Sequence, residues 1–257
     1  MKIVTGISDL DSAYKRFDSG CLSIITCKQP YSGTGYHQLA YQFASKTAVE
    51  QELPVLIFHT GRQYATYPIC HLISHFIGKY LPGYKLIRGC FSDDEWPHFT
   101  NAIDILASAK IRIDFSHYPY LSEVINKTED TVSLHGPGGL VIIDKINLLR
   151  SFLTKEPSDE DWRRILIKLK KVAHKLNIHI ILIMDIDSGD NTDLVSIKAF
   201  NYSDIVLYLD KHDYQKDLVI ITVYSKEFDY HENIKAAFDM TGFSQITTFQ
   251  TCKGKGS

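Results

Sequence analysis

The chain has 257 residues, of which 44% are hydrophobic and 23% are charged. This composition predicts a globular protein with a large core and excludes a disordered or fibrous chain. The 28 basic and 30 acidic residues give a net charge of −2, so any contact with nucleic acid or acidic lipid must be local. Five cysteines without C-x-x-C spacing argue against a disulfide framework and a zinc site. No segment approaches the roughly 18 apolar residues of a membrane span, and no signal peptide follows Met1, so we expect a cytoplasmic protein without membrane contact.

Apolar, β-branched segments bounded by turn residues predict six strands, with helical segments between most of them. We expect strands at 21–26, 55–59, 140–144, 178–184, 205–209 and 218–224. We expect helices at 36–50, 66–80, 93–109, 120–127 and 159–176. This alternation predicts an α/β fold with a mostly parallel twisted sheet and helices on both faces. Ligands of such folds bind at the carboxyl ends of the strands, where we therefore expect a functional site.

The chain shows no internal repeat, which predicts a single domain over residues 1–252 and a flexible tail over 253–257. The predicted helix at 159–176 has apolar residues at three- and four-residue spacing, as in a helix docked on a sheet. Its other face is basic, with Arg163, Arg164, Lys168, Lys170, Lys171 and Lys175. Most basic helix faces are simply solvated, and the alternative is that this face meets a DNA backbone or an acidic partner.

The first predicted strand leads into a turn at the usual position of a phosphate-binding loop. Residues 27–35 read CKQPYSGTG. A working loop, G-x-x-x-x-G-K-[S/T], surrounds phosphates with backbone N–H groups, adds a lysine charge and places a hydroxyl on magnesium. Only Gly33 fits this template, so the segment taken alone is also explained as a flexible turn.

Seven segments, in order along the chain, resemble the motor domain of DnaB-type replicative helicases. They are 5–11 (TGISDLD), Gly20 with the strand after it, Pro30 with Gly33, 53–58 (LPVLIF), 88–96 (RGCFSDDEW), 139–144 (GLVIID) and 169–176 (LKKVAHKL). The resemblance spans roughly residues 5–239 and implies a RecA-like P-loop NTPase fold.

The resemblance also shows where the chain departs from the family in the phosphate-binding loop. Lys28 stands at the position of the first glycine, Thr34 at that of the lysine, and Gly35 at that of the magnesium-binding hydroxyl. Tyrosines are frequent in this region, and we expect them to fill space that nucleotide phosphates occupy in the family. They are Tyr14, Tyr31, Tyr36, Tyr64 and Tyr67.

Other catalytic positions of the family are altered as well. Gly61 stands where a glutamate activates the attacking water, and Asp185 stands where a glutamine ends the sensor strand. Lys226 is the approximate counterpart of a basic residue that reaches the neighbouring subunit. Only Asp144 is retained, as the Walker B carboxylate, and its alternative role is to cap a neighbouring loop. His71 and His75 have i, i+4 spacing but no nearby acidic third ligand, which predicts surface or groove residues rather than a metal site.

Losing one preorganised stabiliser of phosphoryl transfer costs roughly a hundredfold to a thousandfold in rate. The resemblance and its departures together predict a non-catalytic pseudo-ATPase without catalytic residues, cofactor or metal. Its partners would be a replicative helicase, a helicase loader or DNA, in replication or a mobile-element process. Because the family's rings depend partly on an N-terminal latch that precedes the motor domain, we expect a monomer or dimer, with a larger homo-oligomer as the alternative.

Two other functions stay open from the sequence. The first is an active ATP-dependent DNA helicase or ATPase with a rebuilt site. Lys28 would then bind phosphate, Arg62 or His59 would add charge, and Asp144 would hold magnesium with ATP. The second is a KaiC- or RadA-like regulatory or recombination module, since these proteins share the same core.

Overall fold

A computed structural model of the chain describes residues 3–13, 19–27, 35–60, 66–150, 158–185, 201–211, 218–225, 230–239 and 242–245. The strands are β1 (Leu22–Cys27), β2 (Val55–His59), β3 (Ile111–Asp114), β4 (Leu140–Asp144), β5 (His179–Asp185), β6 (Ile205–Lys211), β7 (Leu218–Ser225), β8 (Tyr230–Asp239) and β9 (Gly242–Gln245). The helices are α1 (Ser8–Ala13), α2 (Tyr36–Ser45) with a π-helical turn η1 (Lys46–Glu50), α3 (Thr66–Ile77), α4 (Gly83–Arg88), α5 (Glu95–Ser108), α6 (Leu121–His135), the 3-10 turn η2 (Ile146–Leu148) and α8 (Asp159–Leu176). None of the described helices is long and apolar enough to cross a membrane.

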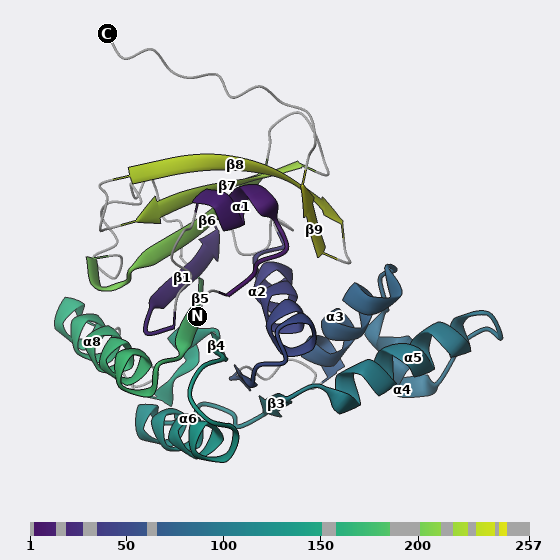
Figure 1. Cartoon of the computed structure of the whole chain (residues 1–257), viewed down its shortest axis with the longest axis horizontal. Helices are drawn as coiled ribbons and strands as arrows, with labels where there is room; N and C mark the ends of the chain where they lie inside the picture. Colours follow the sequence, from purple (N-terminus) through teal and green to yellow (C-terminus); the bar gives the residue numbers. More distant parts are fainter. Residues whose placement is uncertain are drawn as a thin grey trace, which may run out of the picture.

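The described strands form one nine-stranded sheet in the order β3-β2-β4-β5-β1-β6-β7-β8-β9 (Figure 1). The first six strands in this order, from β3 through β1 to β6, pair in parallel with their neighbours. Strands β7, β8 and β9 then extend the sheet at one edge with antiparallel pairing. The α/β fold with a mostly parallel sheet is thus confirmed. The register places His59 opposite Asp144 and Cys27 opposite Asp185, so these strand ends meet at one edge.

Hydrophobic cores lie on both faces of the sheet, as predicted. One core joins α1 and α2 to the sheet, and the other joins α6 and α8 to the opposite face. The α8 helix has the predicted bounds because both of its ends are capped. The Ser158 hydroxyl accepts from the Asp161 N–H at 3.2 Å, the Asp161 carboxylate accepts from the Ser158 N–H, and Asn177 closes the helix in a left-handed conformation.

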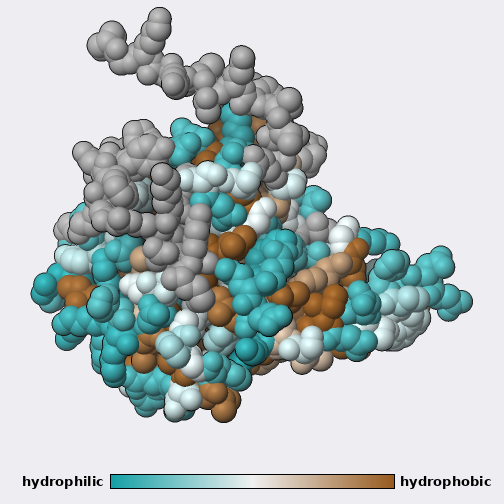
Figure 2. All heavy atoms as spheres, in the orientation of Figure 1, coloured by the Kyte–Doolittle hydropathy of each residue, from teal (hydrophilic) through white to brown (hydrophobic). Residues whose placement is uncertain are grey.

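The helices α3, α4 and α5 extend away from the sheet (Figure 1) and have a small core of their own, centred on Ile73, Leu81 and Ala102. Three aromatic rings pack beside it. Phe91 lies 4.3 Å from Phe99 and 4.9 Å from Trp96 between ring centroids. Elsewhere on the face shown in Figure 2, hydrophilic residues cover much of the described surface.

Candidate functional site

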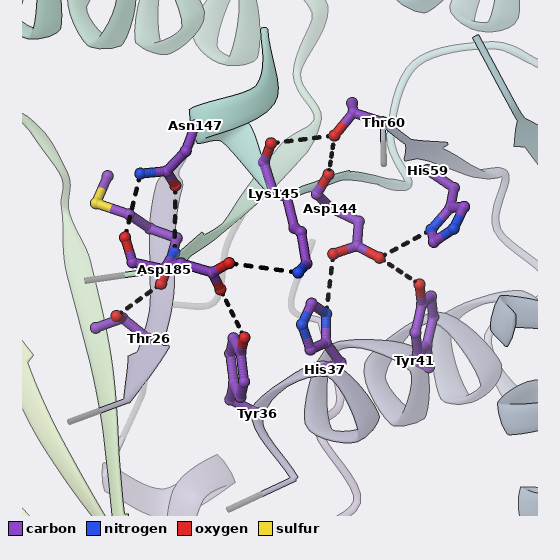
Figure 3. Close-up of polar contacts among 11 residues, drawn as sticks. Thr26, Tyr36, His37, Tyr41, His59, Thr60, Asp144, Lys145, Asn147 and Asp185 are labelled. Atoms are coloured by element: carbon purple, nitrogen blue, oxygen red, sulfur yellow. Dashed lines mark hydrogen bonds and ion pairs between the residues drawn. The ribbon is translucent and has the colours of Figure 1, made fainter. Parts of the chain in front are cut away.

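Two carboxylates stand at the carboxyl ends of adjacent strands. Asp144 is the last residue of β4 and Asp185 is the last residue of β5, and the first turn of α2 lies next to both (Figure 3). A parallel sheet brings these groups together because every one of these strands ends at the same edge. This edge is where the sequence predicted the site.

Asp144 is buried and its carboxylate is surrounded by donors from α2 and β2. The Tyr41 hydroxyl donates to Oδ2 at 2.7 Å, and His59 Nδ1 lies 3.1 Å from the same oxygen. His37 Nδ1 lies 2.9 Å from Oδ1, at ion-pair distance but without hydrogen-bond alignment. His37 and Tyr41 face the carboxylate together because residues four apart share one face of a helix. The side chain of Asp144 is only 1% exposed.

The surroundings of Asp144 favour its ionised form. Burial alone would raise the pKa of Asp144, but the nearby charge of His37 and the polar contacts of His37, His59 and Tyr41 outweigh it. The pKa of the carboxyl is therefore held well below its usual range. Burial, followed by the neighbouring charge of Asp144, raises the pKa of Tyr41, so its hydroxyl stays protonated as a donor.

Aromatic rings from α3 enclose this cluster. The Tyr41 and His71 rings stack with centroids 5.8 Å apart, and Tyr67 meets the edge of His71 at 4.4 Å. Burial, followed by the charge of His37, lowers the pKa of His71 to about 4. His71 is buried, so its prediction as a surface or groove residue is wrong. Within the described ranges, no group of three histidine, cysteine or acidic side chains has the geometry to hold a metal ion.

Asp185 has a different, partly exposed set of partners. Tyr36 donates its hydroxyl to Oδ1 at 2.6 Å, and Lys145 Nζ lies 3.4 Å from Oδ2. The amide of Asn147 exchanges two hydrogen bonds with the Asp185 backbone, at 3.1 and 3.2 Å. Lys145 has a left-handed backbone with φ of 61°, and the Thr60 hydroxyl donates to its carbonyl at 3.0 Å. Neither Lys145 nor Asn147 was singled out from the sequence, although they lie one and three residues after Asp144.

The first turn of α2 packs against the antiparallel edge of the sheet. Gly35 caps the helix with φ of 73°, and a Cβ added there would lie 2.3 Å from the Phe238 ring of β8. The Phe238 ring lies 4.8 Å from the ring of Phe243 in β9. Gln42 of α2 holds β9 in place, because its amide accepts from Phe243 N at 2.7 Å and donates to Phe243 O at 3.1 Å. The start of α2 is therefore occupied by an aromatic side chain.

The remaining predicted site residues fall into two groups. Lys28, Gly33, Thr34, Gly61 and Lys226 lie outside the described residues. The basic residues of α8 lie on the helix that covers the opposite face of the sheet from α2, so the structure does not bring them to the strand-end site. They are Arg163, Arg164, Lys168, Lys171 and Lys175.

A parallel sheet with a carboxylate ending β4, beside the connection from β1 to α2, defines a RecA-like α/β domain of the P-loop NTPase class. The family model of the DnaB-like helicase C terminal domain matches residues 2–192, and the chain belongs to this family.

Solved structures share this fold. An ATPase domain aligns with a TM-score of 0.80 and 18% identity over 96% of this chain and 92% of its own. A DnaB-like replicative helicase, solved for its interactions with primase, aligns with a TM-score of 0.77 and 19% identity over 96% of this chain and 62% of its own. The RadB recombinase aligns with a TM-score of 0.63 and 20% identity over 95% and 99%. A search of curated protein sequences found no match.

Proposed function

We propose that this chain is a non-catalytic member of the DnaB-like helicase family, a pseudo-ATPase that acts by binding a replicative helicase, a helicase loader or DNA. The observation that carries the proposal is the closed environment of Asp144. In this reading, the retained Walker B carboxylate stabilises the fold rather than a magnesium ion.

The donors around Asp144 leave it poorly suited to bind magnesium. Magnesium requires near-octahedral oxygen ligands and usually keeps several of its waters, so a protein carboxylate must present an open oxygen to it. Here Tyr41 and His59 approach one oxygen and His37 approaches the other, in a side chain that is 1% exposed. A magnesium ion would have to displace these donors and enter a buried cluster.

The start of α2 supports the same proposal. A helix N-terminus attracts phosphate through its free N–H groups, and in the family a hydroxyl next to them binds magnesium. Gly35 has no hydroxyl, and the Phe238 ring fills the space beside it. Thr34 stands in place of the lysine and Gly61 in place of the glutamate. With the missing hydroxyl at Gly35, ATP hydrolysis would lose several of the groups that stabilise charge in its transition state.

The family supports the choice of process. One structural neighbour is a replicative helicase studied with primase, so we place this chain among proteins that act at a replication fork or in a mobile-element process. No ATP or magnesium is needed in this role. We also propose that Lys226 contacts a neighbouring subunit, because it is the approximate counterpart of a basic residue that does so in the family.

Isothermal titration of ATP and ADP with magnesium, together with turnover of labelled ATP, tests the proposal. We expect no heat at millimolar nucleotide and no hydrolysis. Micromolar binding with turnover that Lys28→Ala abolishes would contradict the proposal and favour an active ATPase with a rebuilt site. Binding without turnover would instead identify a nucleotide sensor.

A further inference from the structure

Four basic residues form one row along the exposed face of α8. Arg164, Lys168, Lys171 and Lys175 follow one another at spacings of four, three and four residues, which places them on the same side of the helix. All four are exposed. Eleven residues at 1.5 Å rise make the row about 16 Å long.

Charge is segregated onto this helix. The α8 helix contains six basic and three acidic residues, a net charge of 6 − 3 = +3, whereas the whole chain has a net charge of −2. The rest of the chain therefore carries −2 − 3 = −5. A local positive surface on a negative protein attracts polyanions to that surface rather than to the molecule as a whole.

The acidic neighbours of the row do not neutralise it firmly. Arg164 contacts Asp161 at 2.9 Å and Lys175 contacts Glu129 at 3.0 Å, but these two basic side chains are 72% and 71% exposed. Ion pairs this exposed contribute little, so a phosphate can replace the carboxylate. The ion pairs that α8 makes with other described residues involve Arg163, Arg164, Lys170 and Lys175, and none involves Lys168 or Lys171.

Arg163 differs from the row, although it belongs to the same basic face. Its guanidinium binds Glu160 through two hydrogen bonds of 2.7 Å each. Two parallel hydrogen bonds hold this arginine more firmly than a single contact does. The row of four, rather than the whole basic face, is therefore the surface that is free to bind.

The apolar residues of α8 decide what kind of partner fits. Ile165, Leu166, Leu169, Val172 and Ala173 are all buried in the core beneath the helix. Protein interfaces have an apolar centre and are poor in lysine, whereas nucleic-acid contacts depend on lysine and arginine facing phosphates. A regular phosphate backbone therefore matches this face better than an acidic protein does.

We propose that the row Arg164, Lys168, Lys171 and Lys175 of α8 binds the phosphate backbone of nucleic acid without reading its sequence. This inference rests on the proposed accessory role of the chain, and it identifies nucleic acid as the partner in that role. The row lies on the helix that covers the opposite face of the sheet from α2, so we expect it to bind without nucleotide.

Fluorescence anisotropy with short labelled DNA strands and duplexes, without nucleotide, tests this surface on the full chain. The double variant Lys168→Gln/Lys171→Gln removes the two unpaired lysines. The matched control Lys110→Gln/Arg112→Gln removes the same charge from two exposed residues at the edge strand β3. We expect the first pair to weaken binding about tenfold and to reduce the salt slope by roughly 2 between about 50 and 200 mM salt. The control should bind like the original chain, and circular dichroism should show that both variants are folded.

An equal loss in both variants, or no DNA binding even at low salt, would overturn the proposal. Polyglutamate serves as the probe for an acidic protein. If the chain binds polyglutamate but not DNA, and Lys168→Gln/Lys171→Gln weakens that binding, the nucleic-acid assignment is also overturned. If the chain neither binds DNA nor turns over ATP, only the proposed DNA-binding row on α8 is refuted. If the chain turns over ATP and also binds DNA through α8, only the non-catalytic role is refuted.

Discussion

At the scale of single residues, Asp144 makes the sharpest prediction. Its carboxylate is ionised and buried among Tyr41, His59 and His37, and Asp144→Asn removes the charge that these donors face. We expect a loss of about 3 kcal/mol in the free energy of unfolding at neutral pH. Because the folded pKa of Asp144 is lowered, this difference should be complete above about pH 4 and shrink as the pH falls further. Urea unfolding at several pH values measures it.

The same substitution one strand away provides the control. Asp185 is 28% exposed and keeps two backbone hydrogen bonds with Asn147 that do not involve its carboxylate. Asp185→Asn should cost only about 1 kcal/mol. Equal costs for the two variants would contradict the view that Asp144 is the structural centre of the site.

His71 titrates in a separate pH range. Its folded pKa of about 4 lies below the ordinary value of 6.5, so the unfolded chain binds a proton in this range that the folded chain does not. Stability should therefore fall as the pH drops from about 6.5 to 4, by up to about 3 kcal/mol. His71→Phe keeps a ring against Tyr41 and cannot titrate. Its unfolding free energy should stay nearly flat over this range, and a slope like that of the original chain would exclude His71 as the cause.

Part of the site could be predicted from the sequence at this scale. Asp144 and Asp185 end apolar segments, so their place at the sheet edge follows from the strand pattern alone. Their partners could not be assigned in this way. His37 and Tyr41 share a helix face, but which face meets β4 depends on how α2 packs on the sheet. Under the alternative of a rebuilt site, His59 or Arg62 would add charge for a phosphate, and the contact of His59 with Asp144 was not foreseen.

At the scale of elements, the contact between α2 and β8 gives a test with a built-in comparison. Gly35 and Gly89 both have positive φ, of 73° and 63°, so alanine is strained at either position. A Cβ at Gly89 meets nothing within 4 Å, whereas one at Gly35 would lie 2.3 Å from the Phe238 ring. Gly89→Ala should cost about 1 kcal/mol, and Gly35→Ala roughly 1–3 kcal/mol more, measured by urea unfolding.

A second variant separates the backbone strain at Gly35 from the clash between a Cβ there and the Phe238 ring. Phe238→Ala removes the ring that the new Cβ would meet. Starting from Phe238→Ala, adding Gly35→Ala should cost no more than Gly89→Ala does, because only the backbone strain is left. A full additional cost in the double variant would show that the ring does not occupy the start of α2.

The helices and strands could be predicted from the sequence where residues within the element itself, such as caps and apolar spacing, determine its bounds. All six predicted strands form within two residues of their expected bounds, and α8 has the expected bounds because its caps and apolar spacing are local. The α6 helix runs to His135, beyond the predicted 127. Its buried Thr128 and Thr131 donate their hydroxyls to carbonyls one turn earlier, so these polar side chains are satisfied inside the helix. The strands β3, β8 and β9 were not predicted. In the case of β9, a contact from Gln42, 201 residues away in the chain, holds the strand, and a local pattern does not show such a contact.

At the scale of the whole molecule, the closed site predicts that nucleotide does not stabilise the fold. A ligand at a hundred times its Kd adds about 2.7 kcal/mol of stability, which raises the Tm of a chain of this size by roughly 5–10 °C. We expect millimolar ATP with magnesium to leave the Tm unchanged. The variant Tyr41→Phe/Phe238→Ala removes a donor from Asp144 and the ring from the start of α2, so it tests whether these groups close the site. If they do, this variant alone should gain Tm when nucleotide is added. A Tm increase of the same size in the original chain would contradict the closed site, because the buried carboxylate and the packed helix start would then not prevent binding.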